Sequence, residues 1–522
     1  MWRIVLCGLL AVATHAWADV QQLVSAEWLA KNLGREDLVI LDASGPKAYA
    51  AGHIPGAVGA NLFAYAGSGL APAQMEALIQ SWGIGPDKRV VLYDQGGTYM
   101  ATSVLYDLYY YGFPADRLAV LDGGLAKWKA AGGAVTSEGT PAPKPGSFRV
   151  AKLREESRVR LPEFIAASGD PARNALVEAL TPEQHFGAMK FFDRGGHIPH
   201  AIMAPAEDFF NADKTFKSPE EIRRMLAHLG IRPEQQVYTH CGGGIAASVP
   251  YFAAKFMAGY PNVKLYKESQ LEWVRDDRML PMWTYDVPYQ LREKAWLSGW
   301  TAPMIRQFGV SNVSIVDIRP AAAYQKSHVA YAANVPADVF RASLGAPEKL
   351  AEALAAAGVK AGDEAVVISE KGLNPDSALA YVMLERIGQK RVSILSDSVD
   401  DWAFAGLPMA KENAPPLPAT KYAANVRRDT ATPAAAYPRI YLATGKTPPA
   451  KAPEGKVIHV PYTELVNADG SPKPAKDIWA ILVKAGVPRY AELVSIADDP
   501  GEAAVGYFVL KLMGYPDVKM AS

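Results

Sequence analysis

The pattern of apolar and polar positions along the chain predicts strands and helices in turn. Short apolar runs such as residues 89–93 and 236–239 are typical of strands that are buried on both faces of a sheet. Longer helix-like segments ending in Gly lie between such runs. Strands that alternate with helices at this spacing predict parallel sheets with helices on both faces.

One unit of this pattern occurs four times: a helix-like segment, a glycine turn, an apolar strand, a loop and a second helix. The glycine turns lie at residues 82–86, 229–233, 357–361 and 485–489. An earlier strand ends near an acid in the first three units, at Asp42, Glu178 and Asp317. A histidine follows in each unit, as His53, His197, His328 and the vestige His459. Because these histidines recur in units without a thiol, we expect them to be architectural, bonding or capping a turn.

The predicted fold class is therefore α/β, with four tandem doubly wound parallel-sheet domains. The boundaries are 19–140 for domain 1, 150–285 for domain 2, 290–412 for domain 3 and 420–522 for domain 4. The first three units end in a strand and a tryptophan, whereas the fourth stops at residues 517–520, before that segment. We therefore expect domain 4 to be truncated or degenerate.

Length and charge narrow the classes of partner. A chain of 522 residues is too long for one hydrophobic core. The 54 Lys and Arg residues balance 54 Asp and Glu residues, so nothing favours nucleic acid or an anionic membrane as the main partner.

The N-terminus has the pattern of a secretory signal peptide. Residues 1–3 include Arg3, residues 4–13 are apolar, and residues 16–18 have an A-x-A form. We expect a signal at residues 1–18, cleavage after Ala18, and a periplasmic or secreted protein with no transmembrane segment after cleavage. A retained N-terminal anchor is the alternative.

Cleavage removes Cys7 and leaves Cys241 as the single thiol. Cys241 follows a β-prone run, and three glycines separate it from a helix-like run that ends at Gly259. Backbone amides that turn inward at such glycines, next to a helix N-terminus, form a socket for an anion or a thiolate. We interpret Cys241 as a reactive group; the alternative is a small buried hydrophobic residue.

Together these features resemble the rhodanese family of sulfurtransferases, over nearly the whole chain after residue 18. The matching motifs include Gly-His-Ile-Pro-Gly-Ala at residues 52–57, the cysteine loop, and the closing Asp-Gly-Gly at residues 122–124 with Trp128. The resemblance implies that Cys241 takes a sulfane sulfur from a small anionic donor, holds it as a persulfide, and passes it to cyanide or a thiol. The loops of domains 1, 3 and 4 carry no sulfur, so we expect those domains to be inactive, with a protein partner as a candidate for domains 3 and 4.

The resemblance also implies the residues that bind the donor. Arg194 stands at the family's substrate-facing arginine position; a surface arginine beside Asp193 is the alternative. Ser269 matches a hydroxyl position in the closing segment, whereas the serine of mercaptopyruvate sulfurtransferases is replaced here by Gly243. The loop positions predicted to bind substrate are Gly242, Gly243, Gly244, Ile245 and Ala246.

These features predict an extracytoplasmic sulfurtransferase with thiosulfate as the first donor. A 3-mercaptopyruvate sulfurtransferase, a non-turnover persulfide carrier and a scaffold with an incidental thiol stay open. A cysteine phosphatase or arsenate reductase is excluded, because Ala247 occupies the arginine position of a Cys-x5-Arg loop. A dinucleotide site is not supported, because residues 242–244 lack the G-x-G-x-x-G spacing. No His/Cys cluster has metal-ligand spacing, so we expect neither a metal nor a cofactor.

Overall fold

The computed structural model describes residues 21–65, 69–411, 417–426 and 437–521. The predicted signal at residues 1–18, with Cys7, lies outside these ranges. The chain divides into two compact units. The first comprises the described residues within Met1–Val159, Ala206–Ile222 and Gly244–Lys267, and the second those within Arg160–Pro205, Arg223–Gly243 and Glu268–Ser522. In the described ranges, every helix is too short or too polar to cross a bilayer.

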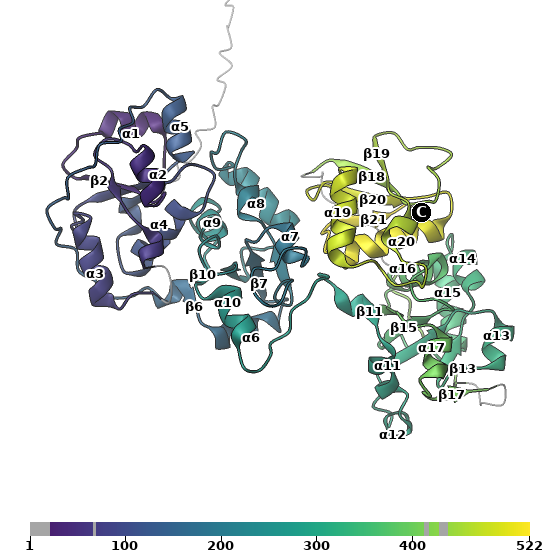
Figure 1. Ribbon diagram of the computed structural model, residues 1–522. Helices are drawn as coiled ribbons and strands as arrows, with labels where there is room; N and C mark the ends of the chain where they lie inside the picture. The colour runs from purple at the N-terminus through teal and green to yellow at the C-terminus, as the bar shows by residue number, and fades with distance from the viewer. Residues whose placement is uncertain (1–20, 66–68, 412–416, 427–436, 522) are drawn as a thin grey trace, which may run out of the picture. The chain divides into compact units, whose positions relative to one another are not determined.

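Domain 1 is a five-stranded parallel sheet of order β1-β5-β4-β2-β3 with helices on both faces. Its strands are β1 (Leu23–Val24), β2 (Leu38–Asp42), β3 (Val58–Gly59), β4 (Arg89–Tyr93) and β5 (Leu118–Leu121). Its α-helices are α1 (Ala26–Asn32), α2 (Pro46–Ala51), α3 (Pro72–Ser81), α4 (Met100–Tyr110) and α5 (Gly124–Ala130). Successive strand side chains point to opposite faces, so Ile40 and Val91 pack with α1 and α5. Helices α3 and α4 lie on the other side of the sheet (Figure 1).

Domain 2 repeats this plan, with the strand order β6-β10-β9-β7-β8. Its strands are β6 (Arg158–Val159), β7 (Asn174–Glu178), β8 (Ala201–Met203), β9 (Gln236–His240) and β10 (Val263–Tyr266). Its α-helices are α6 (Leu161–Ser168), α7 (Pro182–His185), α8 (Pro219–His228), α9 (Ser248–Phe252) and α10 (Ser269–Arg275).

The helix predicted after the cysteine loop is present, but only its first part is an α-helix. It begins only at Ser248, and beyond Phe252 it continues as a π-helix over Ala253–Met257. Pro250 lies in its first turn, where the missing N–H costs no hydrogen bond. The helix N-terminus is therefore seven positions from Cys241 in the sequence, and loop residues 242–247 lie between them.

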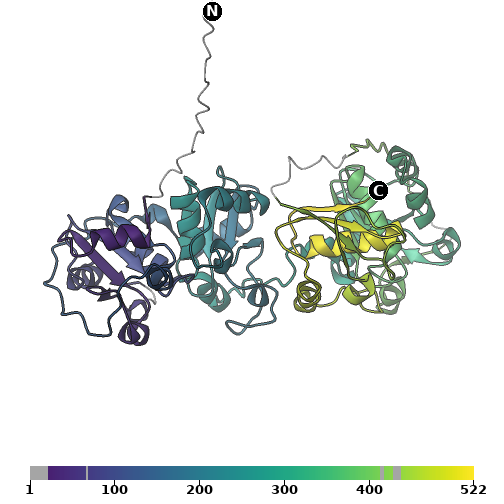
Figure 2. The same ribbon diagram turned by 90° about the horizontal axis from the view of Figure 1, so that it is seen from above.

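Domains 3 and 4 complete the repeat. The third sheet has the order β11-β16-β15-β12-β14 and the fourth β19-β18-β20-β21, and both are parallel. The strands are β11 (Leu291–Arg292), β12 (Val313–Asp317), β14 (Ala332–Asn334), β15 (Glu364–Ile368), β16 (Arg391–Leu395), β18 (Arg439–Ala443), β19 (Lys456–His459), β20 (Glu492–Ile496) and β21 (Val518–Met520), with an antiparallel pair β13 (His328–Val329) and β17 (Met409–Ala410). The α-helices are α11 (Lys294–Trp300), α12 (Pro303–Gln307), α13 (Ala321–Lys326), α14 (Ala337–Ala342), α15 (Pro347–Ala356), α16 (Pro375–Arg386), α17 (Val399–Phe404), α18 (Tyr462–Leu465), α19 (Ala475–Ala485) and α20 (Pro500–Leu512). Four parallel sheets, the last with four strands, confirm the predicted fold class; Figure 2 shows the fourth as yellow arrows.

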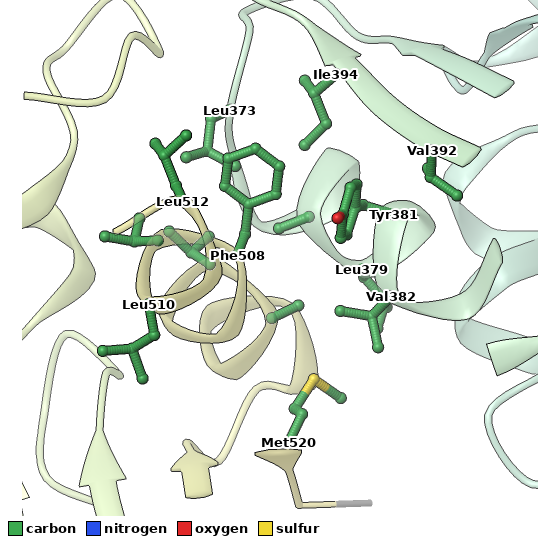
Figure 3. Packing of buried hydrophobic residues seen from close by; sticks show 14 of the residues in the cluster. Leu373, Leu379, Tyr381, Val382, Val392, Ile394, Phe508, Leu510, Leu512 and Met520 are labelled. Carbon is green, nitrogen blue, oxygen red and sulfur yellow. The ribbon is translucent and has the colours of Figure 1, made fainter. Parts of the chain in front are cut away.

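Domains 3 and 4 share one hydrophobic core. Helix α16 is buried almost all round, which is typical of a helix enclosed by protein. Its Tyr381 ring meets Phe508 of α20 edge-on, with ring centroids 4.9 Å apart, and Figure 3 shows Phe508 and Leu512 facing Tyr381 and Leu373. In the first unit, α4 and α9 pair in the same way, with Tyr106 edge-on to Tyr251 at 5.0 Å. In domains 1 and 2, and again in domains 3 and 4, the helices that follow the equivalent loops therefore pack against each other.

Candidate functional site

The candidate site lies where the central strand of domain 2 ends. In each domain this strand is β4, β9, β15 or β20, and ligands of parallel α/β sheets bind at such carboxyl ends. The residues immediately after these strands are Asp94, Cys241, Ser369 and Ala497. A thiol therefore occupies a position that holds a carboxylate, a hydroxyl and a methyl group in the other three domains.

The backbone of Cys241 is held on both sides by the start of α10. The Cys241 N–H donates to Ser269 Oγ over 3.1 Å, and the Cys241 carbonyl accepts from the Gln270 N–H over 3.1 Å. Domain 1 has the equivalent second bond, from Leu125 N–H to the Asp94 carbonyl over 2.8 Å. The thiol-bearing residue is 3% exposed, so its backbone is fixed inside a buried turn.

Ser269 has a backbone conformation that is rare for a residue with a side chain. Its φ is +53°, and Gly124, the corresponding residue of domain 1, has a φ of +54°. A left-handed conformation costs a non-glycine residue about 1–2 kcal/mol. Ser269 is fully buried, and its hydroxyl gives the Cys241 amide an acceptor that glycine could not provide. Strained residues of this kind are concentrated at functional sites.

In domains 1 and 3, the residue equivalent to Cys241 accepts a hydrogen bond on its side chain. The donor is the backbone N–H two residues later in the chain. In domain 1, the Asp94 carboxylate accepts from the Gly96 N–H over 2.8 Å and from the Ala101 N–H over 3.0 Å. In domain 3, Ser369 Oγ accepts from the Lys371 N–H over 3.3 Å. In these two domains the loop thus folds around a negative or electron-rich group. The matching amide in domain 2 belongs to Gly243.

The three glycines of the loop have different steric requirements. A Cβ on Gly242 would lie 2.8 Å from the Phe191 ring, and one on Gly243 would meet nothing within 4 Å. Gly244 has a φ of +77°, and a Cβ there would lie 1.9 Å from the Lys267 carbonyl oxygen. Only glycine fits at position 244, whereas position 243 has room.

Three predicted substrate residues remain. Ile245 and Ala246 belong to the loop, and Arg194 contacts the chain at the end of α10. The Ile245 and Ala246 carbonyls accept backbone N–H groups of the first turn of α9. The guanidinium of Arg194 donates from Nη1 to the Leu280 carbonyl over 2.7 Å and from Nη2 to the Val274 carbonyl over 3.1 Å. Arg194 therefore ties its loop to the end of α10. Donor binding by the loop amides and by Arg194 stays a prediction.

Sequence spacing did not reveal a cluster of buried ionisable groups in domain 2. His185 donates from Nδ1 to Glu178, and His185 Nε2 lies 2.5 Å from Asp286 Oδ1. His197 Nε2 lies 3.3 Å from the same oxygen. Glu178 also accepts from Gln270 Nε2 over 2.8 Å, so the cluster connects to the helix that holds Cys241.

The groups of this cluster shift each other's proton affinity. Burial alone would lower the pKa of His185, but Asp286 and Glu178 outweigh it and raise that pKa to about 9. Burial and the neighbouring His185 lower the pKa of His197 to about 4, which keeps this ring neutral at pH 7. Burial opposes ionisation of Glu178, yet the contact with His185 leaves its pKa below the usual value.

His53, His197 and His328 have the architectural role expected from the sequence. In each of domains 1, 2 and 3, Nδ1 of the histidine bonds a backbone carbonyl, and its ring stacks on the side chain of the residue that owns the carbonyl. The stacked pairs are Tyr49–His53, His185–His197 and Tyr324–His328. Only the middle pair consists of two histidines.

The counterpart of the cysteine loop in domain 3 borders a cavity of about 690 Å³. Its lining includes Ser369 and Lys371 from the loop and Arg319, whose guanidinium is held by Asp317. The residues that line this cavity include no thiol, and the cavity lies at the loop that corresponds to the cysteine loop of domain 2.

Comparison with known proteins agrees with this architecture. A family model described as the rhodanese-like domain matches residues 25–131, 163–276 and 303–405, so the chain belongs to the rhodanese-like sulfurtransferase family. A probable 3-mercaptopyruvate sulfurtransferase of Pseudomonas aeruginosa is 34% identical over 278 residues, which is 49% of this chain and 96% of that protein. A thiosulfate sulfurtransferase of the same organism is 30% identical over 264 residues, 49% of this chain and 95% of that protein. The solved 3-mercaptopyruvate sulfotransferase of Escherichia coli is 24% identical, with a TM-score of 0.44 over 48% of this chain and 98% of that one.

Proposed function

We propose that the protein is an extracytoplasmic sulfurtransferase that moves a sulfane sulfur from thiosulfate, through a persulfide on Cys241, to a thiophilic acceptor. The observation that carries the proposal is the loop geometry of domains 1 and 3. In these domains, Asp94 and Ser369 stand in place of Cys241. The side chain of each accepts a hydrogen bond from the backbone N–H two residues later in the chain. The equivalent amide in domain 2 is that of Gly243, and its donation to the sulfur of Cys241 would stabilise a thiolate or a persulfide there.

The proposed reaction has two steps at the same sulfur. The Cys241 thiolate attacks the sulfane sulfur of thiosulfate; a new S–S bond forms, the S–S bond of thiosulfate breaks, and sulfite leaves with the electron pair. An acceptor such as cyanide or a thiolate then attacks the outer sulfur of the persulfide. The Cys–S–S bond breaks, the acceptor keeps the sulfur, and the Cys241 thiolate is regenerated.

The loop chemistry favours thiosulfate over 3-mercaptopyruvate. Sulfite leaves as an anion without needing a proton, whereas cleavage of a C–S bond releases an enolate that must be protonated. Residues 242–247 are all Gly, Ile or Ala, and none of their side chains can donate a proton. Ser269, the nearby hydroxyl, has its oxygen bonded to the Cys241 amide.

Location and partners of the protein belong to the same proposal. The signal-like pattern at residues 1–18 supports a periplasmic or secreted enzyme, where thiosulfate is a stable small anion. Domains 3 and 4, with Ser369 and Ala497 at the thiol position, supply binding surface in place of a second catalytic centre.

Steady-state assays with each donor test the proposal. Thiocyanate formation from cyanide is measured with thiosulfate and with 3-mercaptopyruvate, for the wild-type chain and for Cys241→Ser. The proposal expects turnover with thiosulfate, at least tenfold lower kcat/KM with 3-mercaptopyruvate, and none from Cys241→Ser. Turnover by Cys241→Ser would refute the mechanism, and a preference for 3-mercaptopyruvate would reverse the donor assignment. Cys241 loading without turnover to cyanide or small thiols would identify a persulfide carrier.

A further inference from the structure

We propose that Gln270 is a positioning residue for Cys241 and that the buried carboxylate of Glu178 holds its side chain. Gln270 lies in the first turn of α10. Its Nε2 donates to Glu178 Oε1 over 2.8 Å and to the Gly196 carbonyl over 3.2 Å. Gln270 is 2% exposed, so these two acceptors take the hydrogens of its amide nitrogen in place of water. The inference rests on the proposed function, because it concerns how the same thiol is held.

The backbone of Gln270 is one of the two contacts that fix Cys241. Its N–H donates to the Cys241 carbonyl over 3.1 Å, and the Cys241 N–H donates to the hydroxyl of Ser269, the preceding residue, over 3.1 Å. A shift of this first turn of α10 therefore shifts Cys241. The Gln270 side chain connects the turn to Glu178, the last residue of β7, which pairs with the strand that leads to Cys241.

A protonated histidine fixes Glu178 in turn. His185 Nδ1 donates to Glu178 Oε2, and His185 Nε2 lies 2.5 Å from Asp286 Oδ1. Burial alone would lower the pKa of His185, but Asp286 and Glu178 outweigh it and raise that pKa to about 9, so the ring is an imidazolium at pH 7. Each carboxylate oxygen of Glu178 thus has its own donor, His185 for Oε2 and Gln270 for Oε1.

Domains 1 and 3 have the same closing helix without the amide side chain. Leu125 in domain 1 and Val399 in domain 3 occupy the position of Gln270, each three residues before the tryptophan of the closing segment. Both side chains are buried and apolar. The Leu125 N–H still donates to the Asp94 carbonyl over 2.8 Å, so the backbone contact forms without a glutamine. The extra link from the side chain is found in the domain that carries the thiol and in neither of these two.

The acid at the end of the equivalent strand also has different partners in these domains. In domain 3, Arg319 donates to Asp317 from Nε and Nη2. In domain 1, Asp42 Oδ1 accepts the Ser44 N–H over 2.8 Å. In domain 2 an imidazolium replaces the guanidinium and leaves one carboxylate oxygen for Gln270. The repeated fold therefore forms without this arrangement, which indicates a role specific to domain 2.

The expected effect is on the rate of the chemical step. Attack on the donor requires the sulfur of Cys241 at one distance and angle, and a loosely held loop reaches that geometry less often. Gln270 is 2% exposed and Glu178 is completely buried, so both lie beneath the surface that the donor approaches. Loss of their hydrogen bond should therefore slow persulfide formation and leave the half-saturating thiosulfate concentration nearly unchanged.

Two glutamine-to-leucine substitutions form a matched pair. Gln270→Leu installs the residue that domain 1 has at this position, and we expect single-turnover sulfite release to slow about tenfold, with the half-saturating thiosulfate concentration within twofold of the wild type. Gln235→Leu is the control, because Gln235 is 5% exposed, bonds only backbone groups of Pro171 and Arg232, and precedes β9 at the end opposite Cys241. It should keep the wild-type rate per folded molecule.

Substitutions at Glu178 identify the contact responsible. Glu178→Gln keeps an oxygen for the Gln270 amide and can donate to the neutral ring of His185, so it should retain the rate within threefold. Glu178→Leu removes the acceptor and should be as slow as Gln270→Leu. The double variant should be no slower than either single one, because both break the same contact. If Glu178→Leu folds poorly, Gln270→Leu and Gln235→Leu still decide.

Amide hydrogen exchange tests the positioning without any sulfur donor. Peptides that carry Cys241 and Gln270 should exchange at least tenfold faster in Gln270→Leu than in the wild type, and at the wild-type rate in Gln235→Leu. Faster exchange in a protein that thiosulfate does not load would support the positioning and refute the proposed function. The positioning is overturned if Gln270→Leu exchanges and releases sulfite as the wild type does, or if Gln235→Leu is equally impaired.

Discussion

The amide of Cys241 donates a hydrogen bond to the hydroxyl of Ser269, a residue with a left-handed backbone, over 3.1 Å. The same backbone position in domain 1 is Gly124, with nearly the same φ. Domain 2 therefore accepts backbone strain to place a hydroxyl beside the thiol-bearing residue. Domain 1 has no counterpart of this contact, because Gly124 has no side chain to accept the hydrogen bond.

Two substitutions at Ser269 distinguish the free-energy cost of its left-handed backbone from the contribution of its hydrogen bond to Cys241. Ser269→Ala keeps the strain and removes the acceptor, so the free energy of unfolding should fall by about 1–2 kcal/mol. Ser269→Gly removes both, and it should be about 1 kcal/mol more stable than the alanine variant. Both should lower kcat/KM for thiosulfate about tenfold, because the loop is less well fixed. Wild-type kinetics in both variants would mean that the hydroxyl has no part in positioning Cys241.

The loop glycines provide a matched pair of substitutions. Gly244→Ala places a methyl group 1.9 Å from the Lys267 carbonyl oxygen at a φ of +77°, so the loop must change its conformation. We expect loss of at least a hundredfold in the rate of persulfide formation, measured by sulfite release in a single turnover. Gly243→Ala meets no atom within 4 Å and should keep the rate within about threefold. Equal effects of the two substitutions would show that loop geometry is not the cause.

Arg194 has two roles that kinetics can distinguish. Its guanidinium bonds the carbonyls of Val274 and Leu280, and it is also the predicted anion-binding residue. Arg194→Ala should raise the KM for thiosulfate about tenfold, because a cation near the donor is lost. Arg194→Lys should recover part of the KM. An unchanged KM together with a lower thermal midpoint would restrict Arg194 to holding the end of α10.

Asp122 gives the first unit a pH-dependent stability. Burial raises its pKa to about 6, although it accepts the Phe216 N–H over 2.8 Å. The folded state thus binds this proton more tightly than the unfolded chain, whose aspartate pKa is about 3.9. The ionised carboxylate costs stability above pH 6, and the cost disappears as the pH falls toward 4.

Asp122→Asn keeps the acceptor oxygen and removes the charge. We expect it to raise the free energy of unfolding by about 1–3 kcal/mol at pH 8 and to have no effect at pH 4, measured by urea denaturation at both pH values. An equal effect at pH 4 and pH 8 would contradict the assignment, because titration of Asp122 could then not be its source.

Most of the fold was predictable from local patterns in the sequence. The apolar runs before Asp94, Cys241 and Ser369 are the central strands of their sheets, and the glycine turns lie where the sequence placed them. The shared core of domains 3 and 4 was not predictable, because contacts such as that between Tyr381 and Phe508 join segments far apart in the chain. The π-helix after Phe252 also leaves no clear mark in the composition of that helix.

Only those residues of the candidate site that are neighbours in the sequence could be predicted. Cys241 and its glycines are neighbours in the chain, so the sequence pattern reveals them directly. His185, His197 and Asp286 are brought together by the fold, and their spacing matches no metal motif. The one signal available was the second histidine of domain 2, which occupies a place that Tyr49 and Tyr324 hold in domains 1 and 3.

The intact mass of the protein after reaction with thiosulfate tests the central claim most directly. The account predicts that the chain gains the mass of one sulfur atom, that peptide mapping places it on Cys241, and that cyanide removes it. Cys241→Ser should gain nothing under the same conditions. A chain that stays at its starting mass with thiosulfate, or that carries the sulfur on another residue, would contradict the persulfide mechanism proposed for this protein.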